Sequence, residues 1–335
     1  MKNTFTSKTA GVPIILLCLL LLLQTPLSGA EDEITGLWEV RMDFDGREMF
    51  ADLVLTRQPD GSLSGMWGSD ELSDVKFQDD KLTFTRTLGE GDRQFTSDFE
   101  ATLTDGKLKG TMTSDWGRTS LVCVRPEPMC PALGKWDMSI SLGDRDINAV
   151  MTISKDPNGK LEGKWTKEPG EHTISDFNYR NGRLTFNRHV KLTEPEMEFE
   201  TPFEGTIESN KLSGTMKNEM GQWQVTGHRI GKELVGRWEL TTTSQRGTRT
   251  HILTIYPDLS GRYEMFGSQV PVENIELEGD QVSFGVEMGP SDRTFRMDFK
   301  GTLKDESLEG QFTTPRDESS VTGEKISSKT IPDVP

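Results

Sequence analysis

The chain has 335 residues and a formal net charge of −16, with 27% charged and 33% hydrophobic residues. An acidic surface repels polyanions, so this balance disfavours nucleic acids and anionic membrane surfaces as partners. The length is more than one ordinary hydrophobic core covers and suits several domains of about a hundred residues each.

Residues 1–30 have the composition of a secretory signal peptide. Lys2 and Lys8 give a positive start, an apolar run extends from Val12 to Leu23, and Ser28-Gly29-Ala30 supplies small residues before the acidic Glu31. The apolar run is short for a membrane span, although a retained N-terminal anchor is the alternative. We therefore expect a secreted or periplasmic protein that is not integral to a membrane once the signal is cleaved.

A Gly-X-Trp triplet occurs three times in the chain. The triplets are Gly36-Leu37-Trp38, Gly134-Lys135-Trp136 and Gly236-Arg237-Trp238. Each is followed, about ninety residues later, by a basic residue: Arg125, Arg229 and Lys325. A repeat of about a hundred residues indicates whole domains rather than small solenoid units. We predict three repeats, over residues 34–126, 132–230 and 234–326, and a disordered tail over residues 327–335.

Each repeat alternates apolar and polar residues in short segments separated by turn residues. Asp60-Gly61 and Asn158-Gly159 lie between apolar runs. Such pairs are strong hairpin signals, because both central residues of the tightest turns need positive φ. Eight such segments per repeat predict an antiparallel meander, and with no helix to cover its edges the meander closes into a barrel. The predicted fold is all-β, with three tandem eight-stranded antiparallel up-and-down barrels; a sandwich is the alternative.

The tryptophan of each triplet and the distant basic residue have a structural explanation. The first and last strands of a closed meander are neighbours. A cationic side chain on the last strand can therefore lie across the indole of the first strand, and its remaining donors can bond carbonyls at the barrel floor. We predict a structural plug in each repeat: Trp38 with Arg125, Trp136 with Arg229, and Trp238 with Lys325.

This constellation resembles the calycin superfamily, which includes the lipocalins and avidins. The sequences of Ile34-Thr35-Gly36-Leu37-Trp38 and of Asp60 to Trp67 are similar to those of the first and third strands of avidin-like barrels. In that family, the aromatic residue that follows Gly-X on the third strand, and not the tryptophan of the first strand, lines the ligand pocket. The resemblance thus implies candidate ligand-lining residues at Trp67, Trp165 and Tyr263. The polar ligand contact of the avidin first strand is replaced by apolar residues here (Val40, Met138 and Leu240), so biotin is not expected.

No catalytic or metal-binding motif is visible in the sequence. The four histidines do not recur between repeats, and the chain lacks HExxH, Gly-X-Ser-X-Gly and a glycine-rich phosphate loop. An active site duplicated with its domain would be expected to recur. We therefore predict a non-enzymatic protein with no catalytic residue, no metal and no cofactor.

The function predicted from these features is that of a secreted binding protein for a small apolar molecule or for a cell-surface polysaccharide or protein. For a polysaccharide, the aromatic residues nearest the barrel mouths that could stack on sugars are Trp67, Trp116, Trp165 and Trp223. For Trp116 and Trp223, a place in the core or rim is the alternative. A protease-inhibitor-like or accessory module acting through barrel loops is the second interpretation. A hydrolase with carboxylate chemistry at one barrel mouth is the third. Filled or shallow barrel interiors are favoured over hollow ones.

Two cysteines, Cys123 and Cys130, flank the junction between the first two repeats. In an oxidising compartment a short-loop disulfide between them is plausible, and two free thiols are the alternative.

Overall fold

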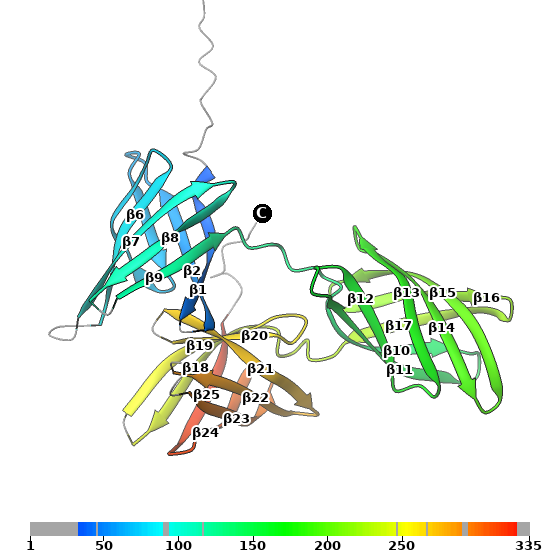
Figure 1. The fold of residues 1–335 in the computed structure, drawn as a ribbon. Coiled ribbons are helices and arrows are strands. Elements are labelled where there is room, and N and C mark those ends of the chain that lie inside the picture. The colour runs from blue at the N-terminus through cyan, green and yellow to red at the C-terminus, as the bar shows by residue number, and fades with distance from the viewer. Residues whose placement is uncertain are drawn as a thin grey trace, which may run out of the picture.

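The computed structural model describes residues 33–44, 46–89, 94–115, 117–245, 247–265, 267–289 and 294–326. Every regular element in these ranges is a β-strand (Figure 1). Within them, no helix has the length and apolar character that crossing a membrane requires. The expected signal peptide over 1–30, the expected tail over 327–335 and Trp116 lie outside the described residues.

The strands form three successive sets, each of which winds into a barrel. The first barrel consists of β1 (Gly36–Phe44), β2 (Arg47–Arg57), β3 (Leu63–Trp67), the two-residue β4 (Asp70–Glu71), β5 (Ser73–Gln78), β6 (Lys81–Leu88), β7 (Phe95–Thr104), β8 (Lys107–Ser114) and β9 (Gly117–Val124). Its strands follow one another antiparallel, and the last, β9, pairs with the first, β1.

The second and third barrels repeat this order. The second consists of β10 (Gly134–Ser141), β11 (Asp146–Lys155), β12 (Leu161–Thr166), β13 (Glu171–Arg180), β14 (Arg183–Thr193), β15 (Glu196–Glu208), β16 (Lys211–Asn218) and β17 (Gly221–Arg229). The third consists of β18 (Gly236–Ser244), β19 (Gly247–Ile255), β20 (Gly261–Met265), β21 (Ser268–Glu278), β22 (Gln281–Met288), β23 (Phe295–Lys304), β24 (Ser307–Thr313) and β25 (Glu318–Ile326). The predicted all-β class of antiparallel barrels is thereby confirmed, whereas the domain limits read from the sequence stay a prediction.

The barrels differ in how completely they close. In the third, each strand pairs with the next and β25 returns to β18. In the second, β12 and β13 are the two ends of the sheet and lie side by side without a ladder between them. Gly163 of β12 allows this contact through side chains, because Phe177 and Ile174 of β13 occupy the space where a Cβ would stand.

The core of each barrel is built by residues that alternate inward along the strands. One aromatic pair recurs at the same cross-strand position of all three barrels, with ring centroids 4.2–4.7 Å apart. These stacked pairs are Phe84 with Phe99, Phe186 with Phe203, and Phe284 with Phe299. Such pairs help to hold neighbouring strands in register, since a slip by one residue would turn every inward side chain outward.

The Asp-Gly hairpin of the first barrel has a different turn from the one expected. Only Gly61 has a positive φ, of 84°, while Asp60 does not. The Asp60 carboxylate accepts hydrogen bonds from the backbone and hydroxyl of Ser62, and the Gly61 amide donates to the Gln58 carbonyl. The side-chain bonds of the aspartate therefore shape a longer turn. The predicted hairpin is present, but the positive φ expected of both residues holds only for Gly61.

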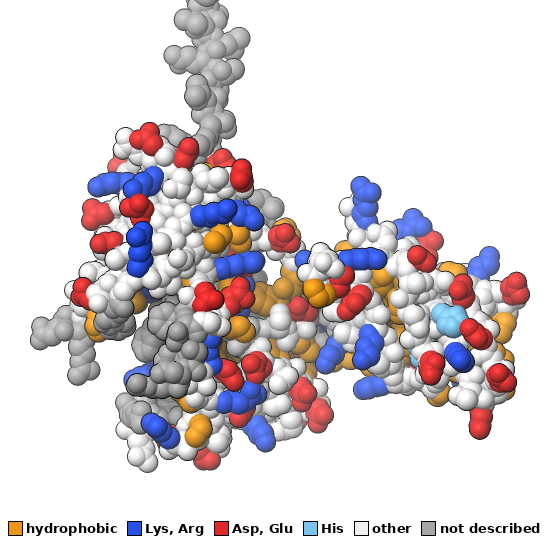
Figure 2. Space-filling model, viewed as in Figure 1, with side chains coloured by type: hydrophobic (Ala, Val, Ile, Leu, Met, Phe, Trp, Pro, Cys, Tyr) orange, Lys and Arg blue, Asp and Glu red, His pale blue; other side chains and the backbone are white. Residues whose placement is uncertain are grey.

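The first and third barrels lie against each other, although the second separates them in the chain. Figure 1 shows the first barrel resting on β19 and β20 of the third, with the second set to one side. One backbone pairing, between Phe50 of β2 and Gln269 of β21, joins the two. Acidic and basic side chains are intermingled on the visible face of the molecule (Figure 2).

Candidate functional site

Trp38 and Arg125 lie together at one end of the first barrel, which is called the closed end below. The Trp38 ring is fully buried, and its indole N–H donates to the Ile34 carbonyl at 2.8 Å. The Arg125 guanidinium lies 3.7 Å from the ring centroid and donates to the carbonyls of Leu37 and Thr35. Burial lowers the pKa of Arg125, although Glu33 opposes this; the group stays charged.

The other two barrels hold the same pair at the same end. Arg229 lies 4.3 Å from the Trp136 ring centroid and donates to the carbonyls of Leu133 and Pro131. In the third barrel Lys325 lies 5.3 Å from the Trp238 ring centroid and donates to one carbonyl. The pairs predicted from the sequence are thus in contact, and their role as plugs remains a proposal.

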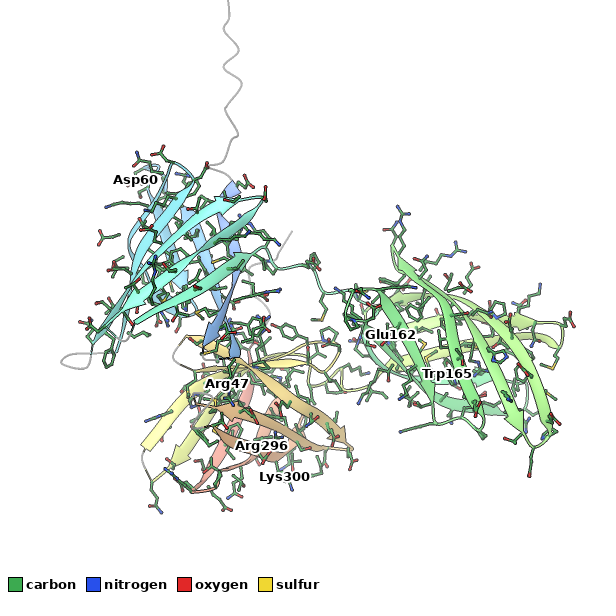
Figure 3. All side chains as sticks on the ribbon, viewed as in Figure 1. Arg47, Asp60, Glu162, Trp165, Arg296 and Lys300 are labelled. Atoms are coloured by element: carbon green, nitrogen blue, oxygen red, sulfur yellow. The ribbon has the colours of Figure 1, made fainter. Side chains whose placement is uncertain are left out.

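The three candidate ligand-lining aromatics lie deep inside their barrels. Trp67, Trp165 and Tyr263 are 0%, 4% and 1% exposed. Trp67 packs edge-on against Phe84 and Phe99, and Tyr263 stacks on the His251 ring at 5.3 Å. Figure 3 shows Trp165 among the strands of the second barrel. These aromatics are therefore core residues, and an open pocket has to lie elsewhere along the barrel axis.

In each of the first two barrels, a buried arginine covers the tryptophan of this set. Sequence reasoning missed these two arginines. Arg86 of β6 lies 5.2 Å from the Trp67 ring centroid and donates to Asp70 at 2.7 Å. Arg188 of β14 lies 4.7 Å from the Trp165 ring centroid. Both arginines are 4% exposed, and burial lowers the pKa of each guanidinium while its paired carboxylate raises it. The result is a charged layer across the interior of the first two barrels.

The layer in the second barrel is self-contained. Glu168 accepts hydrogen bonds from both Trp165, at 2.7 Å, and Arg188, and Arg188 also donates to the Thr201 hydroxyl at 3.2 Å. The third barrel has Val286 at the position of these arginines, and its interior there is apolar. A signal for the layer was present in the sequence, since Leu-Thr-Phe-X-Arg occurs in the first two repeats and places arginine in the inward phase.

Beyond Arg86, the open end of the first barrel holds a cavity of about 280 Å³. Its walls are mostly apolar, and three of the residues in them are methionines. The lining residues are Met42, Met49, Arg86, Leu88, Phe95, Thr96, Ser97, Met112, Ser114, Asp115, Thr119 and Ser268. Methionine side chains are flexible and polarisable, so such walls adapt to apolar molecules of different shapes.

The same inward positions are filled in the other barrels. Met42, Leu88 and Met112 of the first barrel are partly exposed. Their counterparts are buried in the second barrel (Ile140, Val190 and Met216) and, at two of the three positions, in the third (Met288 and Phe312). The cavity therefore depends on residues particular to the first barrel and is not a general feature of the barrel fold.

The residue opposite Met112 explains this difference. Met112 pairs across strands with Thr119, whose short side chain lines the cavity. Met216 of the second barrel pairs with Trp223, which packs onto that barrel's core. In the third barrel the Phe312 ring itself packs into the aromatic cluster. A small residue on β9 thus leaves the space that a tryptophan fills on β17.

Both cysteines are free in the structure, which corrects the candidate disulfide. Cys123 points into the core of the first barrel, whereas Cys130 packs against the core of the second. A bond between them would require Cys123 to leave its core, because each side chain serves a different barrel. Burial raises the pKa of the Cys123 thiol to about 12.

We expect a thiol reagent at pH 8 to modify Cys130 well before Cys123 in the folded chain. The thiolate is the reactive form, and Cys123 is both fully buried and protonated at this pH. Mass spectrometry of the labelled peptides measures each site separately. A Cys130→Ser variant is the control, and labelling of its Cys123 without denaturant would contradict the expectation.

Among the described residues, no group of three or more His, Cys, Asp or Glu side chains is arranged to hold a metal ion. No family model matches the chain, and no curated protein matches it.

Solved structures give weak similarities. The chain is similar to isotype 1 transferrin binding protein B from serogroup B Neisseria meningitidis, with a TM-score of 0.20 and 10% identity over 83% of this chain and 63% of that one. A transferrin binding protein B double mutant from Haemophilus parasuis gives a TM-score of 0.18 and 10% identity over 87% and 74%. A porin-like protein from Bacteroides vulgatus gives 0.17 and 8% over 88% and 99%. TM-scores this low establish no common arrangement, so no activity is transferred from these proteins.

Proposed function

We propose that the protein is a non-enzymatic binding protein whose first barrel holds a small apolar molecule at its open end. The observation that carries this proposal is the cavity of about 280 Å³ with apolar walls. Ligand pockets are typically concave, mostly apolar and furnished with a few polar groups, and the cavity has this character. Arg86 at its floor and the hydroxyls of Thr119 and Ser268 at its side supply polar groups that could orient a ligand.

The positions of Trp67, Trp165 and Trp223 favour this function over the binding of a polysaccharide, and Trp116 lies outside the described residues. Sugar stacking needs an aromatic face open to solvent, whereas Trp67 and Trp165 are covered by arginines and Trp223 packs onto a core. The expected secretion and the absence of catalysis stay predictions alongside this proposal.

Thr119→Trp is expected to fill the cavity and weaken binding strongly. Trp223 shows how an indole at this position packs against the methionine opposite it. The probe is N-phenyl-1-naphthylamine, a neutral dye whose fluorescence rises in apolar surroundings. We expect the wild-type chain to bind one dye molecule saturably and the variant to bind it at least about tenfold more weakly, a difference of ~1.4 kcal/mol.

Ser120→Trp is the matched control, because Ser120 is the next residue of β9 and is exposed on the outer face. It adds the same indole to the same strand without entering the cavity. Equal binding by wild type and Thr119→Trp would place the dye elsewhere and overturn the proposed site.

A further inference from the structure

The hairpin between β20 and β21 of the third barrel completes the charged layer of the first. The buried Trp67 indole donates to the Gly267 carbonyl at 2.9 Å. In the second barrel the corresponding donor, Trp165, finds its acceptor in Glu168 of the same barrel. The first barrel thus takes from its neighbour an acceptor that the second barrel supplies for itself.

Gly267 fits closely between the paired groups of that layer. A Cβ at this position would overlap the Arg86 guanidinium and stand 3.0 Å from the Asp70 carboxylate. The φ of Gly267 is +67°, which also favours glycine. The next residue, Ser268, lines the cavity together with Arg86. The third barrel therefore packs against Arg86, which forms the floor of the candidate site, and contributes Ser268 to one of its walls.

Contacts outside the cavity hold this hairpin in place. Arg262 of β20 donates to Glu39 of β1 at 2.6 Å, and its guanidinium lies 3.9 Å from the Phe50 ring centroid. Burial alone would raise the pKa of Glu39, but Arg262 and Arg41 hold it below its ordinary value, so the carboxylate is charged at neutral pH. The pair is mostly shielded from solvent, which strengthens it relative to a surface ion pair.

Two further contacts flank the hairpin. Gln269 donates to the Asp52 carboxylate at 3.0 Å. Arg47, at the end of the first barrel that faces the third (Figure 3), donates to Glu287 at 2.8 Å and to the Gly289 carbonyl at 2.9 Å. These contacts link the rims of two barrels that the second repeat separates in sequence.

We propose that the ligand site is a composite of the first and third barrels, and that ligand binding and the docking of these barrels stabilise each other. This inference rests on the proposed function. A ligand that touches Ser268 or Arg86 binds best when the hairpin is docked, because only then is the wall present. By reciprocity, bound ligand strengthens docking by the same factor by which docking strengthens ligand binding, so a variant whose barrels are undocked binds the ligand more weakly.

Arg262→Ala in the full chain tests the inference, because Arg262 holds the docked hairpin but does not line the cavity. We expect this variant to bind N-phenyl-1-naphthylamine about fivefold more weakly than wild type, the lower end of typical coupling between sites. The control is Arg296→Ala, whose ion pairs with Glu273 and Asp298 stay within the third barrel. It is expected to bind the dye as wild type does.

Glu39→Gln weakens the same ion pair by a substitution in the first barrel. It therefore distinguishes a loss of docking from misfolding of the third barrel. A weakening by both Arg262→Ala and Glu39→Gln supports the composite site, and wild-type affinity in both overturns it. The two proposals fail differently. If Thr119→Trp loses the dye while Arg262→Ala and Glu39→Gln keep it, the proposed ligand site is retained and the proposed coupling to docking is rejected. If the wild-type chain binds no dye, both proposals are rejected.

Discussion

Glu168→Ala is expected to destabilise the second barrel by about 3–5 kcal/mol, because it leaves the Arg188 charge buried without its carboxylate. Arg188 and Glu168 are 4% and 9% exposed, so water cannot replace the lost partner without opening the barrel. The substitution also removes the acceptor of the Trp165 indole N–H. Both losses leave buried donors unsatisfied, which is the costly way to break such a network.

The matched control replaces the pair as a whole. Arg188→Val combined with Glu168→Leu is expected to cost less than Glu168→Ala alone, because no unpaired charge remains. The third barrel is the precedent, since Val286 is buried at the position of Arg188. Hydrogen exchange of peptides from β10–β17 measures the opening of this barrel, with peptides from β1–β9 as an internal reference. A double variant less stable than Glu168→Ala would contradict this account.

Trp136→Ala is expected to destabilise the second barrel by about 3–5 kcal/mol, the usual cost of removing a large buried aromatic. The variant leaves a cavity at the closed end and loses the indole hydrogen bond to the Ala132 carbonyl. It also removes the ring on which the Arg229 guanidinium rests. A loss of this size would support the proposed plug.

Trp223→Thr provides the comparison, because it truncates a tryptophan of the same barrel that is only partly buried. It reproduces the residue of the first barrel, Thr119, and is expected to cost clearly less than Trp136→Ala. The same hydrogen-exchange peptides report both variants. Equal losses would mean that the closed end gives no special stability to the barrel.

The barrel architecture could be predicted from local sequence because each determinant is local or recurs. Alternation fixes which residues point inward, and turn residues end each strand. The Gly-X-Trp triplets and the distant basic residues indicated that first and last strands meet. The Asp60-Gly61 turn was misjudged because the aspartate side chain bonds Ser62, a competing interaction that the dipeptide rule ignores.

The charged layer was within reach of sequence reasoning, but the inward phase of Arg86 and Arg188 was overlooked. Both follow a phenylalanine by two residues on a strand whose inward positions are otherwise apolar. An arginine there requires a buried acidic partner, and Asp70 and Glu168 each stand three residues after the third-strand tryptophan. A search for apolar residues at inward positions does not detect a buried arginine, because it counts only apolar residues as core residues.

The cavity and the composite rim could not be predicted in this way. The cavity depends on one small side chain, Thr119, standing where another repeat has Trp223, and the register that aligns them is a product of folding. The contact of Gly267 with Trp67 joins segments far apart in the chain. No local rule connects two such positions, because their proximity follows from how whole barrels dock.

The pairing of the first and last strands also determines where the covalent links between the barrels begin and end. Arg125 contacts Thr35 and Leu37, so the chain enters and leaves the first barrel at the same, closed end. The same holds for the second barrel, where Arg229 contacts Leu133. The covalent links between barrels thus never cross an open rim. Rim loops that take no part in the docking of the first and third barrels are therefore free to change in length and composition during evolution while the covalent linkage between barrels stays intact.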